Sequence, residues 1–110
     1  MAKEIERFAD LKSSQESRRL SQVTYRLTGD ERFRDDRGLR WQAQEAAVSS
    51  MGNIAEAHGR YSFEDKRRFL DIARGSCKEL QSHLYVALDQ AYITRHEFDE
   101  AYHQAEVVAQ

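Results

Sequence analysis

The chain has 110 residues, of which 33% are charged and 40% hydrophobic, and its formal net charge is −2. A chain of this length forms a single domain, expected to span residues 1–110, and the near balance of charge excludes a global basic field for nucleic acid. It contains no proline and only five glycines, which argues against a turn-rich fold, so the composition predicts an all-α protein.

The first periodic segment runs from about residue 4 to residue 27, and Gly29 follows as a stop signal. The charged stretch 28–38 then connects to the next helix, and we expect Phe33 to fold back onto the core. The apolar positions of this first helix are Ile5, Phe8, Leu11, Leu20, Val23 and Leu27.

The second segment runs from about residue 39 to residue 57, and its inward face consists almost entirely of small side chains. Small side chains let helix backbones approach closely, which places this helix centrally or at a subunit contact. Gly59 ends the helix and Ser62 is positioned to cap the next one. The inward positions are Leu39, Ala43, Ala46, Ala47, Ser50, Ile54 and Ala57.

The third segment, from about residue 63 to residue 92, is the longest. Gly75 inside it costs roughly 1 kcal/mol relative to alanine, and we expect close contact with a neighbouring helix to offset that cost. The apolar positions are Phe69, Leu70, Ala73, Cys77, Leu80, Leu84, Leu88 and Ala91.

The fourth helix has the sharpest boundary in the chain, because Thr94 and Glu97 match a capping box and Ile93 and Phe98 match a hydrophobic staple. Its apolar positions are Phe98, Ala101, Tyr102, Ala105 and Val108. The short connections around residues 59–62 and 92–94 force successive helices to run antiparallel. The predicted architecture is an up-and-down antiparallel four-helix bundle.

Cys77 is the only cysteine, so no internal disulfide forms and secretion is not indicated. Its place on the apolar stripe predicts a buried small hydrophobe rather than a nucleophile. The N-terminal sequence lacks the apolar core of a signal peptide, and no apolar run is long enough to span a membrane. We therefore expect a cytoplasmic protein without a membrane partner.

Polar residues also lie on the second and third helices. Asn53, Glu56 and Arg60 share one helix face, and Ser76 and Glu79 lie on the antiparallel partner helix. We predict that these five residues form a hydrogen-bonded layer that fixes the helix register. The alternative is acid–base chemistry by Glu56 and Glu79, which would need a pocket and shifted pKa values.

Enzymatic and metal sites have weak support. His96, Glu100 and His103 share a helix face, but a di-metal bundle needs a second Glu-x-x-His motif and two further glutamates. We therefore predict no metal, no cofactor and no catalytic residues, and no small-molecule substrate is evident.

Basic side chains are the remaining candidates, as a nucleic-acid-binding surface. Acidic residues are interspersed with them, so a solvated helix surface is the competing interpretation. The candidates are Arg18, Arg19, Arg60, Lys66, Arg67, Arg68 and Arg74.

Two linked motifs carry a family resemblance. The first comprises Ala46, Ala47 and Ser49, then Asn53 to Glu56, then Arg60; the second comprises Ala73, Gly75, Ser76, Glu79 and Leu80. Together with Phe8, Asp10, Leu11, Tyr25, Thr28 and the Gly38-Leu39-x-x-Gln42 element, they resemble the four-helix bundle proteins also called 23S rRNA-intervening sequence proteins. Gln44 and Glu45 depart from the family pattern, which commonly has paired arginines there; Ser14, Met51 and Ala57 also depart.

The resemblance implies a homo-oligomeric bundle, with pentameric rings known in the family, and brings no established enzymatic activity. It also implies a relation to accessory proteins of diversity-generating retroelements, which partner a reverse transcriptase and nucleic acid. We therefore expect a non-enzymatic homo-oligomeric scaffold or interaction protein. The alternative is a nucleic-acid-binding accessory protein.

Overall fold

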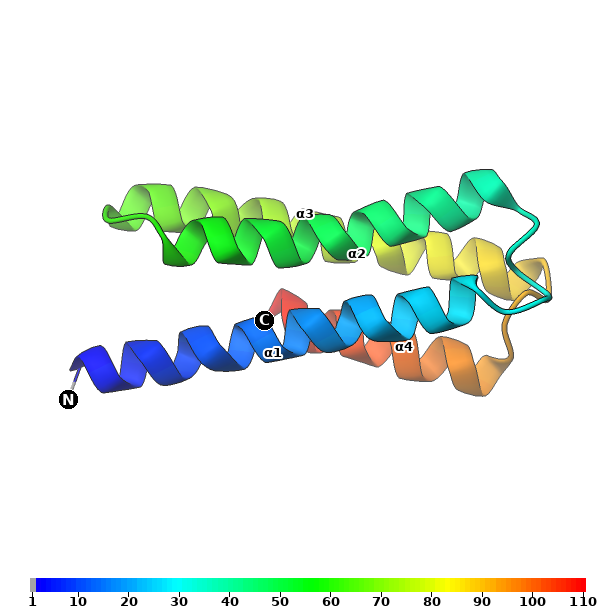
Figure 1. The fold of residues 1–110 in the computed structure, drawn as a ribbon, viewed down its shortest axis with the longest axis horizontal. Helices are drawn as coiled ribbons and strands as arrows, with labels where there is room; N and C mark the ends of the chain where they lie inside the picture. Colours follow the sequence, from blue (N-terminus) through cyan, green and yellow to red (C-terminus); the bar gives the residue numbers. More distant parts are fainter. Residues whose placement is uncertain (1) are drawn as a thin grey trace.

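The computed structural model describes residues 2–110, apart from the side chains of Glu6 and Phe8. The described chain folds into four helices and no strand (Figure 1). The helices are α1 (Ala2–Thr28), α2 (Arg37–His58), α3 (Phe63–Asp89) and α4 (Arg95–Ala109). The four predicted helices are confirmed, with ends shifted by a few residues at most. Phe8, predicted to join the first apolar stripe, has a side chain outside the described set.

Each helix packs against two others, and the pairs in contact are α1 with α2, α2 with α3, α3 with α4, and α4 with α1. The connections lie at alternating ends of the bundle, so successive helices run antiparallel (Figure 1). The described part measures 47 × 21 × 17 Å along its principal axes. This arrangement is the predicted up-and-down antiparallel four-helix bundle.

Side-chain caps define where three of the helices begin. The Asp36 carboxylate accepts a hydrogen bond from the Leu39 backbone N–H at 3.1 Å, and the Ser62 hydroxyl accepts one from Asp65 N–H at 3.1 Å. At α4 both halves of the predicted capping box are present: Glu97 N–H donates to the Thr94 hydroxyl, and Thr94 N–H donates to the Glu97 carboxylate. Each cap satisfies a backbone donor that the helix itself leaves free.

The core combines leucines of α1 and α3 and Phe98 of α4 with small side chains, most of them alanines of α2 and α4. The alanines of α2 are buried as predicted, which lets its backbone lie close to its neighbours. Phe33 is also buried as predicted, and its ring lies 5.3 Å from that of Tyr92. The buried hydrophobic cluster is Leu20, Val23, Leu27, Phe33, Ala43, Ala46, Ala47, Cys77, Leu80, Leu84, Ala87, Ile93, Phe98, Ala101 and Ala105.

Several predicted core positions are wrong for the isolated chain. Ile5 and Leu11 are 66% and 58% exposed, and Leu70 is also exposed. The cause at Ile5 and Leu70 is the length of α4: it has 15 residues against 27 in α1 and in α3, so it leaves their far ends uncovered. Figure 1 shows the chain ending partway along the bundle, while α1 continues past it.

Two backbone expectations on α3 are also wrong. A side chain built at Gly75 would meet nothing within 4 Å, so no close helix contact within the chain offsets its cost. Ala91 lies beyond the helix end, with a positive φ of 61°. There the N–H of Tyr92 donates to Ala87 O at 2.9 Å, and the N–H of Ala91 donates to Leu88 O at 3.0 Å. These two bonds form a Schellman motif, which ends α3 before the predicted residue 92.

Candidate functional site

The α2–α3 interface contains a polar contact, centred on Ser49. The Ser49 and Ser76 hydroxyl oxygens lie 2.9 Å apart and join the two helices. Asn53 donates from Nδ2 to the Ser49 backbone oxygen at 2.8 Å and to its hydroxyl at 3.2 Å. Two of the five predicted layer residues, Asn53 and Ser76, therefore meet through a residue that the prediction left out.

The other three predicted layer residues do not join this contact among the described side chains. Arg60 Nη2 lies 2.9 Å from Glu56 Oε2 in an exposed pair along α2. Glu79 Oε1 lies 3.4 Å from His83 Nε2 along α3. Each glutamate thus pairs with a residue four positions further along the chain instead of across the interface: Glu79 within α3, and Glu56 with Arg60 just beyond the end of α2. Both glutamates are exposed, so the pocket required for acid–base catalysis does not surround them.

Ser49 escaped the prediction although a signal for it was present. It stands four residues before Asn53, a spacing that puts an amide next to a hydroxyl on one helix face. The small residues beside it in the sequence, Ala46, Ala47 and Ser50, predict close helix packing rather than a polar contact. The pairing of Ser49 with Ser76 depends on how far each helix is rotated about its axis, which the pattern of one helix does not specify.

Cys77 lies at the centre of α3 and is fully buried, as predicted. Burial raises the pKa of its thiol to about 11, against a smaller opposing effect of the hydrogen bond with Ser50. A thiol with this pKa carries almost no thiolate at neutral pH, so Cys77 is a packing residue rather than a nucleophile.

The predicted basic candidates divide into separate groups. Arg18 and Arg19 lie in the middle of α1, whereas Arg60 and residues 66–68 flank the α2–α3 turn. The guanidinium groups of Arg60 and Arg68 lie 4.7 and 4.9 Å from the centroid of the Phe69 ring. Arg74 donates from Nε to the Ala109 backbone oxygen at 3.2 Å, at the end of α4. The seven candidates therefore do not form one continuous basic surface.

The histidine-containing face of α4 has no metal-binding geometry. Glu100 pairs with Arg26 of α1 at 2.7 Å, and His96 and His103 are exposed. Among the side chains that the structure describes, which leave out Glu6, no group of three or more His, Cys, Asp or Glu is placed to hold a metal ion.

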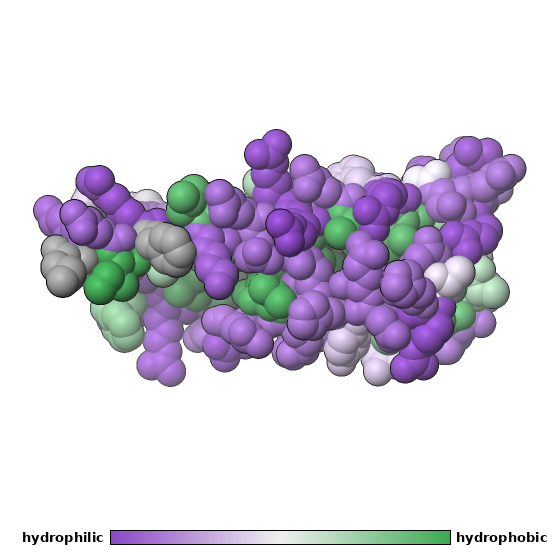
Figure 2. All heavy atoms as spheres, turned by 90° about the horizontal axis from the view of Figure 1, so that it is seen from below, coloured by the Kyte–Doolittle hydropathy of each residue, from purple (hydrophilic) through white to green (hydrophobic). Residues whose placement is uncertain are grey.

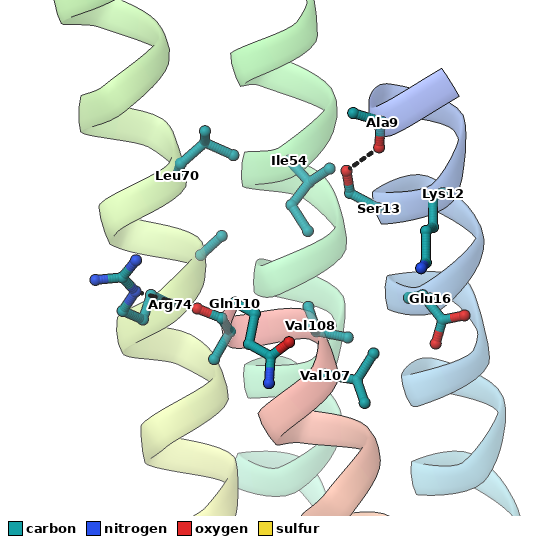
Figure 3. A pocket seen from close by; sticks show the side chains of 12 residues that line it. Ala9, Lys12, Ser13, Glu16, Ile54, Leu70, Arg74, Val107, Val108 and Gln110 are labelled. Atoms are coloured by element: carbon teal, nitrogen blue, oxygen red, sulfur yellow. Dashed lines mark hydrogen bonds between the residues drawn. The ribbon is translucent and has the colours of Figure 1, made fainter. Parts of the chain in front are cut away.

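A pocket of about 410 Å³ opens where α4 ends (Figure 3). Its apolar wall comes from α2, α3 and α4, and its rim carries the charged side chains of Lys12, Glu16 and Arg74. We call it the α4-end pocket. Its lining residues are Ala9, Lys12, Ser13, Glu16, Ile54, Leu70, Ala73, Arg74, Val107, Val108, Ala109 and Gln110.

The pocket lies beside the last residues of α4, between α1 and α3. Ile54 of α2 lies in its floor and is buried, whereas Leu70 of α3 is exposed (Figure 3). On the rim, Glu16 accepts a hydrogen bond from Gln104 Nε2 at 2.8 Å. The hydroxyl of Ser13 on its lining donates to the Ala9 backbone oxygen at 2.7 Å, and aliphatic side chains form the wall, so the pocket suits the binding of an apolar group.

A second, shallower hollow of about 200 Å³ lies on the outer side of α1 and α2. It surrounds the only tryptophan of the chain, Trp41, whose surface is 61% exposed. We call the residues that line it the Trp41 patch: Tyr25, Trp41, Gln44, Glu45 and Val48.

The face of the bundle seen from below, which α1 and α4 form, is mainly hydrophilic (Figure 2). Figure 2 shows the molecule from below, with hydrophobic side chains breaking a mainly hydrophilic surface near the start of α1 and near the middle. None of the helices described is both long and apolar enough to cross a membrane.

A protein-family model matches most of the chain. No curated protein matches the chain. The family model described as 23S rRNA-intervening sequence protein matches residues 9–110, which include all four helices apart from the first turns of α1. The match spans both motifs that carry the resemblance and agrees with the observed bundle. The chain therefore belongs to the 23S rRNA-intervening sequence protein family.

Proposed function

We propose that this protein is a non-enzymatic, homo-oligomeric scaffold, in which copies of the bundle cover one another's apolar surfaces. The observation that carries the proposal is the exposed apolar surface of the single chain. Trp41 and Ile5 are both more than half exposed, and the α4-end pocket has an open apolar wall. Single exposed apolar residues are common on monomers, but a contiguous apolar surface such as the wall of the α4-end pocket is typical of an interaction site.

A non-enzymatic role agrees with the chemistry of the polar side chains. Glu56 and Glu79 each pair with a residue four positions further along the chain, and the only thiol is buried with a raised pKa. The Ser49–Ser76 contact lies in the helix interface, where it fixes how α2 and α3 align.

The test is the molar mass of the protein by light scattering over a micromolar dilution series. We expect a multiple of the single-chain mass of 12.8 kDa that falls on dilution. The pentameric ring implied by the family resemblance would give five times that mass. A mass of 12.8 kDa at every concentration would exclude the scaffold built from copies of this chain.

A second candidate function is binding of single-stranded nucleic acid as an accessory protein, with a reverse transcriptase as the partner implied by resemblance. The observation that favours it is the α2–α3 turn, where Tyr61 is fully exposed and Phe63 is 79% exposed. Arg60 and the basic residues 66–68 flank these two rings. Aromatic rings beside cations are the combination that stacks bases and contacts phosphates. Glu64 and Asp65 in the same segment weaken the local field.

Filter binding of a labelled single-stranded oligonucleotide over a salt series tests this candidate. Phosphate contacts predict affinity that falls steeply with salt, and Tyr61→Ala should weaken binding by about tenfold, within the ~1–3 kcal/mol that stacking on one base contributes. Tyr25→Ala, which changes an exposed tyrosine elsewhere on the bundle, is the matched control. Absence of binding at low salt would eliminate the candidate.

A further inference from the structure

The chain exposes two apolar surfaces of different shape. The Trp41 patch presents a large aromatic side chain on the outer side of α1 and α2, and the α4-end pocket is a recess lined by small and aliphatic side chains. Two copies related by a two-fold axis bring the same surface together with itself, whereas a ring or a chain of copies joins two different surfaces. An exposed tryptophan side chain and a deeper apolar recess on one molecule favour the second kind of contact.

The Trp41 patch has the features of an anchor. Trp41 is 61% exposed, with Val48 two turns further along the same face of α2. Glu45 lies between them, one turn from Trp41, and is exposed. It makes no ion pair with any side chain that the structure describes. Tryptophan is enriched among the residues that dominate binding energy at protein interfaces.

The α4-end pocket has the complementary features. Its volume of about 410 Å³ lies within the ~300–1,000 Å³ typical of sites that enclose a ligand-sized group, so it has room for an indole ring. Two cations, Lys12 on α1 and Arg74 on α3, stand on its rim (Figure 3). Neither forms an ion pair with another side chain within the described part of the chain.

We propose that Trp41 of one copy inserts into the α4-end pocket of the next copy, and that Glu45 of the first copy then faces Lys12 and Arg74 of the second. The inference rests on the proposed homo-oligomer and names the surfaces that build it. Burial of the indole removes apolar area from water on both surfaces. The Glu45 carboxylate meets a rim with two cations and one carboxylate, Glu16, which already accepts a hydrogen bond from Gln104 Nε2. The contact is head-to-tail, because Trp41 lies in the first turns of α2 and the pocket lies toward the other end of the bundle.

Trp41 reports directly on its own surroundings, since the chain has no other tryptophan. In the assembled protein we expect blue-shifted Trp41 emission with weak quenching by acrylamide, and a red shift when dilution dissociates the particle. An assembled particle with strongly quenched, red-shifted emission would overturn this contact while leaving the homo-oligomer standing. A monomeric protein at all concentrations would overturn both.

Substitutions test the pairing of the two surfaces. Trp41→Ala should raise the dissociation constant of the assembly at least about tenfold, as for a residue that dominates an interface. Val86→Ala, which shortens an exposed aliphatic side chain on α3 away from both surfaces, should change the dissociation constant less than twofold. Unchanged far-ultraviolet circular dichroism confirms that each variant folds. Assembly by Trp41→Ala as tight as that of the wild type would contradict the proposal.

Exchanging the charges at Glu45 and Arg74 distinguishes a specific contact between the two surfaces from non-specific apolar association. Glu45→Lys should weaken assembly because it places a third cation beside Lys12 and Arg74, and Arg74→Glu in the same chain should restore it. Glu79→Lys, at an exposed carboxylate outside both surfaces, is the matched control for adding positive charge. Equal weakening by Glu45→Lys and Glu79→Lys, without rescue by Arg74→Glu, would show that Glu45 does not face the pocket.

Discussion

Ala91 adopts a left-handed backbone conformation, which is unfavourable for residues with a Cβ atom. Its φ of 61° places it in the left-handed region, where the Schellman motif at the end of α3 requires it. A residue with a Cβ atom loses roughly 1–2 kcal/mol in this region relative to its preferred conformations. The motif forms because its two hydrogen bonds satisfy carbonyls that the last turn would otherwise leave free.

Ala91→Gly should therefore stabilise the protein. Removal of the Cβ atom relieves the strain, and the added flexibility of the unfolded chain offsets about 0.4–1 kcal/mol of the gain. We expect a net increase of about 0.5 kcal/mol in the free energy of unfolding, measured by urea denaturation. Ala55→Gly, at an exposed position inside α2, should instead lower it by about 1 kcal/mol. Destabilisation by Ala91→Gly equal to that by Ala55→Gly would contradict the account of this turn.

The Glu97 carboxyl group makes the stability of the fold depend on pH through the capping box of α4. The hydrogen bond from Thr94 N–H and, to a lesser degree, contact with Arg32 lower the pKa of its carboxyl below the ordinary value of 4.5. A lowered folded-state pKa means that the charged carboxylate stabilises the fold above about pH 4.5, and that this contribution is lost as pH falls through the folded-state pKa.

Glu97→Gln should make the fold less sensitive to acid. Glutamine keeps the capping-box geometry but does not titrate, so the loss of unfolding free energy between neutral and acidic pH should be smaller than in the wild type. Glu4→Gln, at an exposed carboxylate near the start of α1, is the control for the loss of one negative charge. Urea denaturation at a series of pH values measures both. Identical acid sensitivity of Glu97→Gln and the wild type would refute the role given to Glu97.

The alignment of α2 with α3 depends on a small polar contact between small residues. Ser49 and Ser76 share a hydrogen bond within an interface that alanines otherwise dominate, and Asn53 supports Ser49 from the next turn. The contact is shielded, because Ser76 is buried and Ser49 is partly buried. A buried hydroxyl that loses its partner costs more than the bond itself contributes.

A double-mutant cycle measures this contact. Ser49→Ala and Ser76→Ala should each lower the free energy of unfolding by about 1 kcal/mol, and the double variant should lose less than the sum of the two. Glu56→Ala, which breaks only an exposed pair along α2, should cost about 0.5 kcal/mol at most. Fully additive losses in the double variant would mean that the two hydroxyls do not interact.

The helices could be predicted from the sequence because their signals are local. A capping residue lies within one turn of the backbone groups that it bonds, as Ser62 does at α3 and Thr94 and Glu97 do at α4. Gly29 directly follows the end of α1, and the periodic apolar residues lie within the same segments. Burial at Leu20 or Leu80 could also be predicted, because every helix of the bundle passes alongside these positions.

The exposed ends and the polar contact could not be predicted in the same way. Whether Ile5 and Leu70 are covered depends on where α4 stops relative to two other helices, which no single segment encodes. Asn53 and Glu56 are three residues apart, a spacing that puts both on nearly the same side of α2. The rotation of α2 about its axis leaves Asn53 partly buried and turns Glu56 to solvent. The Trp41 patch and the α4-end pocket could not be predicted either, because each is formed by side chains from more than one helix.

At the scale of the whole molecule, a single chain leaves apolar surface uncovered at both ends of the bundle. Trp41 marks one end, and Ile5 with the α4-end pocket marks the other. A four-helix bundle of this length has a modest core, and the additional burial provided by neighbouring copies would stabilise it by mass action. The central claim is therefore that the functional unit contains several copies of the chain.

Small-angle X-ray scattering of the wild-type protein at micromolar concentration tests this claim most directly, since it gives particle mass and size together. The single chain has a mass of 12.8 kDa and a Cα radius of gyration of 14.7 Å. We predict a mass that is a whole-number multiple of 12.8 kDa and a radius of gyration well above 14.7 Å. A particle with the mass and radius of one chain would contradict the account.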